Sequence, residues 1–237
     1  GNIGLPLAAC AEESAGLDAL VVEVSSFQLE AVDRFRPAAA ALLNVTPDHY
    51  DRHGGPGPYL AAKLALFRHM PDAGRIVLRD DVARLPEVRE LLRGRSGAPV
   101  LFAPSPRPDC AFFAESGALC ERQADGRVRR LLALDELPLV GMHNAENALA
   151  ALALVRAFGQ CPARAAAALP TFRPSPHRLE LVAEIGGVRF VNDSKATNVD
   201  AMCRALETVA DGAAAPSILL VGGGLDKDID FSMALPV

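Results

Sequence analysis

Short apolar runs recur along this chain, and segments with the apolar spacing of helices lie between several of them. Such alternation favours strand–helix–strand units, in which parallel strands are buried by helices. The sequence therefore predicts an α/β fold with a mostly parallel sheet. The expected strands are residues 20–24, 39–45, 75–78, 100–103, 188–191 and 218–221.

The segment 143–155 carries the clearest helical pattern. Ala148, Leu152 and Val155 recur at helical spacing on one apolar face, and the polar residues gather in the first turn. We expect a helix there. Residues 109–134 instead hold three short β-prone stretches separated by single glycines, a pattern typical of an antiparallel meander at a sheet edge.

Closely spaced prolines mark the best candidate for a linker. Pro170, Pro174 and Pro176 restrict the backbone and disfavour helix on either side. We place a domain boundary near Pro174, which gives a central domain over 1–174 and a second domain over 175–237. The second segment is short for an independent hydrophobic core.

The two ends of the chain bear on its completeness. The chain opens with Gly1-Asn2-Ile3-Gly4, without an initiator methionine, and holds no Gly-x-x-x-x-Gly-Lys-Ser/Thr phosphate loop. It stops at Val237, where another element is expected to begin. We interpret the chain as an internal piece of a longer enzyme, truncated at both ends, and expect no catalysis from it alone.

Composition argues against several classes of function. The net charge is −5, the pI is near 5.6 and the basic residues are scattered, so no surface is expected to bind nucleic acid or an anionic membrane. The five cysteines form no Cys-x-x-Cys pair, which is typical of buried thiols in a reducing compartment. No apolar run approaches the roughly 20 residues that span a bilayer. We therefore expect a cytoplasmic protein.

Polar motifs follow several of the expected strands, where open α/β sheets place their ligands. They are Glu-Val-Ser-Ser-Phe-Gln-Leu-Glu at 23–30, Asn-Val-Thr-Pro-Asp-His-Tyr-Asp-Arg-His at 44–53, Ser-Pro-His-Arg-Leu-Glu at 175–180 and Asn-Asp-Ser-Lys-Ala-Thr-Asn at 192–198. A fifth motif, His-Asn-Ala-Glu-Asn at 143–147, opens the expected helix.

Two positions suggest a cation site, and the surroundings of a third, Lys63, are unusual for a lysine. Residues 48–53 hold two carboxylates and two imidazoles, which would suit magnesium or manganese, or would form a polar loop that caps a strand. Glu23 has apolar neighbours on both sides, so its charge is costly unless it is paired or binds a cation; exposure at an edge strand is the alternative. Lys63 shares its helix face with three apolar residues, and such desolvation favours the neutral amine. A lysine that snorkels to solvent is the alternative.

Two pairs of residues are candidates for nucleotide contacts. Asn144 and Asn147 share one face of a first helical turn, beside N–H groups that favour anions; simple N-capping by Asn144 is the alternative. Arg178 can clamp a phosphate and Asp193 can accept ribose hydroxyls. A surface ion pair between Arg178 and Asp193 is the alternative.

Taken together and in this order, the motifs resemble those of the Mur ligases, and the resemblance runs along nearly the whole chain. It implies a central ATP-binding domain without its phosphate-loop start, followed by a truncated Rossmann-like C-terminal domain. It also implies ATP-dependent amide bond formation through an acyl phosphate. The motifs at 23–30 and 192–198 point to the member that adds D-glutamate to UDP-N-acetylmuramoyl-L-alanine in peptidoglycan precursor synthesis.

The resemblance implies a role for each matching residue. Glu23, His49 and Lys63 would hold two Mg²⁺ ions, with Lys63 as a carbamate formed with carbon dioxide. The residues implied to act in catalysis are Lys63, His49 and Lys195. Those implied to bind ATP are Asn144, Asn147, Arg178 and Asp193. Those implied to bind the other substrates are Asn2, Ser25, Gln28, Thr197 and Lys227.

The implied partners are small molecules, with no nucleic acid and no membrane, and the implied state is a monomer. Two other functions stay open. A metal-dependent phosphohydrolase would use the cluster at 48–53 without ATP, but it would leave Asn144 and Asn147 without a purpose. A catalytically silent fragment would only bind a nucleotide or a partner weakly.

Overall fold

The structure is a computed structural model, which describes residues 7–10, 13–72, 75–210, 218–224 and 231–234. Its main element is a six-stranded sheet in which the strands lie in chain order. These strands are β1 (Ala39–Leu42), β2 (Arg75–Arg79), β3 (Val100–Ala103), β4 (Phe112–Glu115), β5 (Ala118–Arg122) and β6 (Val128–Ala133). Strands β1 to β4 are parallel, and β5 and β6 are antiparallel to their neighbours. The predicted α/β fold with a mostly parallel sheet is confirmed.

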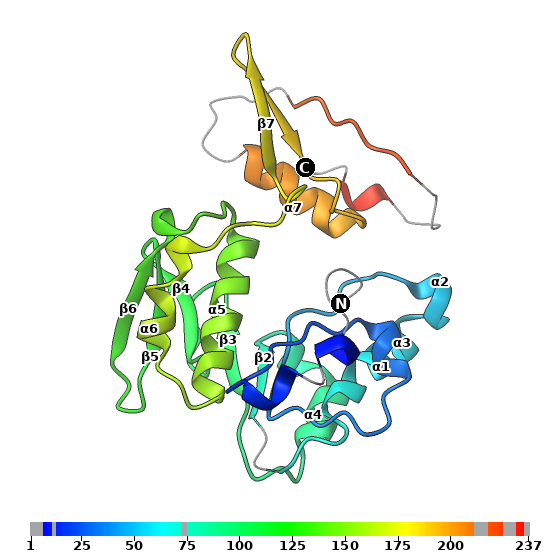
Figure 1. The fold of residues 1–237 in the computed structure, drawn as a ribbon, viewed down its shortest axis with the longest axis vertical. Helices are drawn as coiled ribbons and strands as arrows, with labels where there is room; N and C mark the ends of the chain where they lie inside the picture. The colour runs from blue at the N-terminus through cyan, green and yellow to red at the C-terminus, as the bar shows by residue number, and fades with distance from the viewer. Residues whose placement is uncertain (1–6, 11–12, 73–74, 211–217, 225–230, 235–237) are drawn as a thin grey trace.

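Helices cover both faces of this sheet (Figure 1). The α-helices are α1 (Ser26–Glu30), α2 (Tyr50–His53), α3 (Pro56–Leu64), α4 (Pro86–Leu92), α5 (Met142–Ala157), α6 (Pro162–Ala166) and α7 (Val199–Ala210). Short 3-10 turns are η1 (Leu7–Cys10), η2 (Glu13–Gly16), η3 (Ala65–Phe67), η4 (Val82–Arg84), η5 (Leu134–Glu136), η6 (Leu169–Thr171) and η7 (Phe231–Ala234).

Strand β2 shows how one apolar sequence fills two cores. Ile76 and Leu78 pack in the cluster beneath α4 and η3, whereas Val77 packs in the cluster under α5. Successive side chains of a strand point to opposite faces, so a run of three buried apolar residues needs a layer on each side. Both layers are present, and all three side chains are 4% exposed or less.

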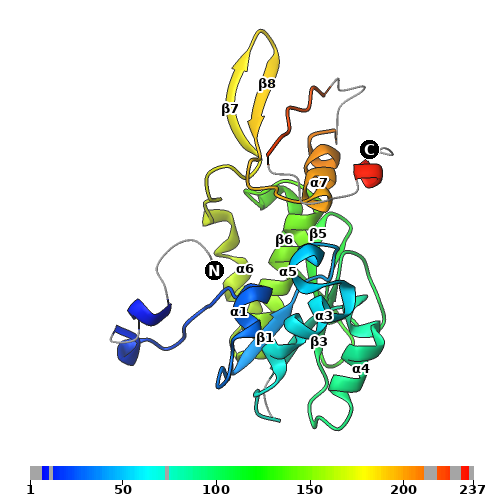
Figure 2. The ribbon, with the colours of Figure 1, turned by 90° about the vertical axis from the view of Figure 1, so that its right-hand side faces the viewer.

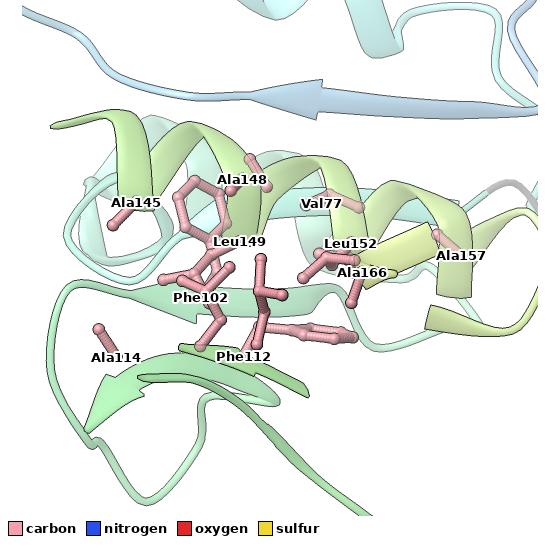
Figure 3. Packing of buried hydrophobic residues seen from close by; sticks show 14 residues of the cluster. Val77, Phe102, Phe112, Ala114, Ala145, Ala148, Leu149, Leu152, Ala157 and Ala166 are labelled. Atoms are coloured by element: carbon pink, nitrogen blue, oxygen red, sulfur yellow. The ribbon is translucent and has the colours of Figure 1, made fainter. Parts of the chain in front are cut away.

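Helix α5 supplies the larger core, and its predicted position is confirmed. Leu149 and Leu152 point into the sheet, where Phe102 of β3 and Phe112 of β4 lie against them (Figure 3). All four side chains are 1% exposed or less. Truncating either leucine to alanine would cost about 2 to 5 kcal/mol through lost burial and the cavity left behind.

The expected meander is confirmed at the edge of the sheet. Strands β4, β5 and β6 form it, and the turns between them use Gly117 at φ 70° and Gly126 at φ 83°. Such left-handed backbone is easily adopted by glycine. Because β4 also pairs in parallel with β3, the meander extends the main sheet.

Two predicted strands are wrong. Residues 20–24 and 218–221 belong to no strand, and Val21 and Leu219 are 94% and 90% exposed. A strand is stabilised by a neighbouring ladder and by burial of its apolar face. Within the described ranges neither segment has a ladder partner, and β1 forms the free edge of the sheet.

A separate hairpin follows the proline-rich segment. It consists of β7 (Glu180–Ile185) and β8 (Val188–Asn192), joined by Gly186 and Gly187, both with positive φ, as a two-residue hairpin turn requires. The predicted strand at 188–191 is therefore present, but it pairs antiparallel. The hairpin projects away from the six-stranded sheet in both views (Figures 1 and 2). Residues 172–175 carry no helix or strand, and the boundary near Pro174 stays a prediction.

Candidate functional site

A cavity of about 1050 Å³ lies where the hairpin and α7 meet the first part of the chain. Residues from both sides of Pro174 line it. Five residues singled out from the sequence are among them: Asn144, Asn147, Arg178, Asp193 and Lys195. The fold thus brings the expected nucleotide contacts of two distant segments to one place.

Asn144 lies in the first turn of α5 and contributes its side chain to the wall of this cavity. Its Nδ2 donates to the carbonyl oxygen of Val140 at 2.8 Å and lies 2.9 Å from Nε2 of His143. The N-cap of α5 is Gly141, so the alternative that Asn144 caps the helix is wrong. Burial lowers the pKa of His143, and the positive charge of Arg204 on α7 acts in the same direction.

Asp193 and Arg178 do not pair with each other. Oδ1 of Asp193 accepts the backbone N–H of Leu179 at 3.0 Å, while Arg178 is exposed on the cavity wall. Leu179 adopts a left-handed φ of 46° and His177 one of 67°, which is strained for side chains of this kind. The turn therefore presents the guanidinium of Arg178 to the cavity without a carboxylate partner from Asp193.

Lys63 occupies the partly desolvated position expected from its neighbours. Its Nζ donates to the carbonyl oxygen of Asn44 at 3.1 Å and lies 4.8 Å from the ring centre of Tyr59. Burial lowers the pKa of Lys63, and the carboxylate of Asp48 partly opposes this. Burial, followed by the charge of Asp48, raises the pKa of Tyr59 to about 12.

Asp48 and His49 form the turn that enters α2. His49 is in the left-handed region at φ 54°, and its Nε2 lies 3.5 Å from Oδ2 of Asp48. The same Oδ2 accepts a hydrogen bond from Nδ2 of Asn198 at 3.0 Å. The other oxygen, Oδ1, is buried and has no hydrogen-bond partner in the part of the chain that the structure describes.

Sequence reasoning missed a clamp between α1 and α2. The side chain of His53 is 1% exposed, and its Nε2 lies 3.1 Å from the hydroxyl of Ser26. Its Nδ1 lies 2.9 Å from Oε1 of Glu30, and the other oxygen of Glu30, Oε2, pairs with Arg52 at 3.3 Å. The ring of Phe27 stacks on that of His53 at 5.3 Å. Ser26 and Glu30 are four apart on α1 and share a helix face, the one signal that pointed to this clamp.

The clamp changes the interpretation of the 48–53 cluster. Both ring nitrogens of His53 are engaged by Ser26 and Glu30, so His53 is not available as a metal ligand. Phe27 also lies against the ring of His49, with 4.7 Å between ring centres. Among the described residues, no group of three His, Cys, Asp or Glu side chains is close enough to hold a metal ion.

Glu23 does not have the surroundings expected from the sequence. It is exposed, in a segment before α1 that carries no helix or strand. The expectation of a carboxylate enclosed by apolar strand neighbours is wrong. Its assignment as a Mg²⁺ ligand stays a prediction.

The remaining site residues have varied surroundings. Ser25 and Gln28 form a capping box at the start of α1, with each side chain accepting the other's backbone N–H at 3.3 and 2.9 Å. Thr197 is exposed in the turn before α7. Asn2 and Lys227 lie outside the described residues.

The composition also led to expectations about the burial of the cysteines and about membrane-spanning segments. All five cysteines are unbridged; Cys110 and Cys120 are buried, but Cys161 is exposed, so the expectation that all are buried is wrong. In the described ranges, no helix has both the length and the apolar character needed to cross a bilayer.

Comparison with known proteins decides the family. A model of the Mur ligase middle domain matches residues 1–155. The chain belongs to the Mur ligase family. Within this family it is 40% identical over 239 residues to the UDP-N-acetylmuramoylalanine–D-glutamate ligase of Acidobacterium capsulatum, covering 100% of this chain and 50% of that protein. The chain spans about half the length of the curated relatives it matches.

Solved structures of Mur ligases share the fold. MurF from Acinetobacter baumannii superposes with a TM-score of 0.59 at 22% identity, covering 75% of this chain and 38% of that one. MurF ligase from Thermotoga maritima, solved in complex with ADP, has a TM-score of 0.50 at 18% identity and covers 73% of this chain and 39% of that one. At these identities the likeness shows the fold alone.

Proposed function

We propose that this chain forms part of an ATP-dependent ligase that joins D-glutamate to UDP-N-acetylmuramoyl-L-alanine. The name of the relative from Acidobacterium capsulatum and the intact motifs at 23–30 and 192–198 support this member of the family. The observation that carries the proposal is the cavity, which gathers residues of the two segments on either side of Pro174.

The nucleotide occupies this cavity. Asn144 and Asn147 offer amide groups from the start of α5, and Arg178 offers a guanidinium that matches phosphate oxygens. Asp193 keeps one oxygen on the N–H of Leu179 and offers the other to a ribose hydroxyl. The ADP complex of the Thermotoga maritima enzyme supports a nucleotide site in this fold.

The residues around Lys63 fit a divalent cation. Oδ1 of Asp48 is a buried carboxylate oxygen without a partner in the described part of the chain, and carboxylate oxygen is the ligand that Mg²⁺ prefers. His49 adds an imidazole beside it. A lowered pKa increases the fraction of Lys63 that is a neutral amine, which is the form that adds carbon dioxide to give a carbamate and releases one proton. When bound, Mg²⁺ neutralises charge on the phosphate oxygens.

The reaction has two steps. The γ-phosphoryl group passes to the terminal carboxylate of UDP-N-acetylmuramoyl-L-alanine and leaves ADP and an acyl phosphate. The amine of D-glutamate then attacks the acyl carbon, and inorganic phosphate departs as the amide forms. Lys195 and Thr197 position D-glutamate beside the cavity, and the chain contributes mainly orientation and charge neutralisation.

The phosphohydrolase alternative loses support. It drew its metal ligands from the 48–53 cluster, and one of the two imidazoles of that cluster, His53, is engaged by Ser26 and Glu30. The silent-fragment alternative predicts weak nucleotide binding that does not depend on Arg178.

The test uses the protein that contains this chain and measures ADP release. Release should require both UDP-N-acetylmuramoyl-L-alanine and D-glutamate. Arg178→Ala should raise the KM for ATP about ten- to a hundredfold, because a charge-assisted contact is lost. Arg127→Ala is the matched control, since Arg127 pairs with Asp125 in the exposed turn between β5 and β6. The ligase proposal would be refuted by phosphate release that occurs without D-glutamate and that has the same rate in Arg178→Ala as in the wild type.

A further inference from the structure

We propose that Asn198 is a positioning residue that fixes the Lys195–Thr197 turn against the Asp48–His49 turn through one hydrogen bond. The proposal rests on the proposed function, because it concerns how two groups of residues of that reaction are held together. Asn198 is not among the residues given a role in substrate or metal binding, and the bond uses Oδ2 of Asp48, whereas the oxygen proposed for the cation is Oδ1.

Both the nitrogen and the oxygen of the Asn198 side-chain amide form hydrogen bonds. Its Nδ2 donates to Oδ2 of Asp48 at 3.0 Å, across 150 positions of sequence. Its Oδ1 accepts the N–H of Ala201 at 2.8 Å and so caps the first turn of α7. The cap fixes the amide orientation, so the donor is aimed at Asp48 before the contact forms.

The turn that leads to Asn198 is stiff. The N–H of Ala196 donates to the carbonyl oxygen of Asp193 at 2.8 Å, and the N–H of Lys195 donates to that of His177 at 3.2 Å. Asp193 in turn accepts from Leu179. Movement of Asn198 is therefore transmitted to Lys195.

The other partner of the bond lies beside the expected catalytic residues. Asp48 directly precedes His49, and its charge acts on Lys63. Its side chain is 15% exposed, and a charge-assisted hydrogen bond is stronger in such a partly dry place. The bond therefore sets the distance between the Lys195 turn and the surroundings of Lys63.

A second contact holds α7 further along its length. A Cβ built on Gly141, the N-cap of α5, would collide with Oγ1 of Thr208. This close approach leaves α7 little freedom to slide along α5. With its first turn tied to Asp48, α7 is held at two points, and only the first of them reaches the Asp48–His49 turn.

The test exchanges the two partners in the protein that contains this chain. Asn198→Asp keeps a good helix cap but faces Asp48 with a second carboxylate. Asp48→Asn alone removes the carboxylate acceptor. The double variant Asn198→Asp with Asp48→Asn restores one amide–carboxylate hydrogen bond in the reverse direction. Gln123→Glu, in the turn between β5 and β6, is the control for the same amide-to-carboxylate change at a remote position.

Two measurements decide the proposal. Asn198→Asp should lower kcat/KM for D-glutamate about ten- to a hundredfold, yet the same change should raise kcat/KM when Asp48 is already Asn. Hydrogen exchange of residues 46–53 should rise in Asn198→Asp and fall back in the double variant. Losses that simply add, or exchange that does not recover, would overturn the positioning role. A wild type without substrate-dependent ADP release would refute the proposed function, while hydrogen exchange would still decide the bond.

Discussion

The hydroxyl of Ser26 lies 3.1 Å from Nε2 of His53, although the two residues are 27 positions apart. The opposite ring nitrogen of His53 lies 2.9 Å from Glu30. A carboxylate only accepts, so Nδ1 carries a proton, and the hydroxyl of Ser26, which can donate or accept, is the partner of Nε2. This clamp joins the Ser25–Gln28 motif to the turn that carries His49, and it makes His53 a structural requirement of the site.

We therefore expect His53→Ala to destabilise the protein by about 1 to 3 kcal/mol, because Ser26 loses its buried partner. Urea unfolding followed by circular dichroism measures this. Arg52→Ala is the matched control: Arg52 is 62% exposed and pairs with the same Glu30, so its loss should cost under about 1 kcal/mol. Equal costs for both variants would show that the clamp does not stabilise the fold.

Lys63→Ala should lower ligase turnover at least about tenfold, the smaller end of the range for residues that support a metal site. Acetate or formate should restore part of it, because a soluble carboxylate replaces the carbamate oxygens. Lys63→Arg should also lower turnover, because keeping the positive charge does not replace the carbamate. Steady-state ADP release at a fixed Mg²⁺ concentration measures all three, and normal turnover of Lys63→Ala would make this lysine purely structural.

The pKa of Lys63 predicts a pH dependence with a defined sign. Burial lowers this pKa, so the neutral amine should appear at a lower pH than in an ordinary lysine, and amine-directed labelling should begin there. Asp48 raises the same pKa, so Asp48→Asn should move the labelling curve to still lower pH. Mass spectrometry of the peptide with Lys63, beside a free peptide of the same sequence, gives the curve. A shift to higher pH in Asp48→Asn would contradict the assigned electrostatics.

The sign for stability follows from the same shift. A lysine whose folded pKa is lowered binds its proton less tightly in the folded state, so its contribution opposes folding while the unfolded lysine is charged. This penalty shrinks as pH rises from the folded pKa towards the ordinary value of 10.5. Lys63→Met should remove this component of the pH dependence of unfolding.

Gly141 should tolerate substitution less well than another glycine with similar backbone. Gly141→Ala imposes a positive φ of 99° on alanine and drives its Cβ into Thr208. Gly159→Ala imposes φ 84° in open space, so it measures the backbone cost alone, about 1 to 2 kcal/mol. Unfolding free energies should show the larger loss for Gly141→Ala, and Thr208→Ala should recover part of it. Equal losses would show that α7 does not press on α5.

Local pattern was sufficient for much of the fold. The helix at α5 and strands β1, β2 and β3 follow from apolar periodicity, since their core-facing residues lie close together in sequence. The same pattern failed at 20–24 and 218–221, where apolar runs have no ladder partner in the described chain. An apolar run favours a strand, but the strand forms only where a neighbouring strand is available to pair with it.

The site divides in the same way. The sequence by itself determined which residues carry chemistry: the motif order, the amides opening α5, and a lysine whose apolar neighbours partly desolvate it. The tertiary structure alone decided their partners, turning His53 towards Ser26 and Glu30, leaving Asp193 on Leu179, and joining Asn198 to Asp48. Periodicity reports contacts between residues a few positions apart. Partners 27 or 150 positions apart depend on how the whole chain closes, which no local pattern encodes.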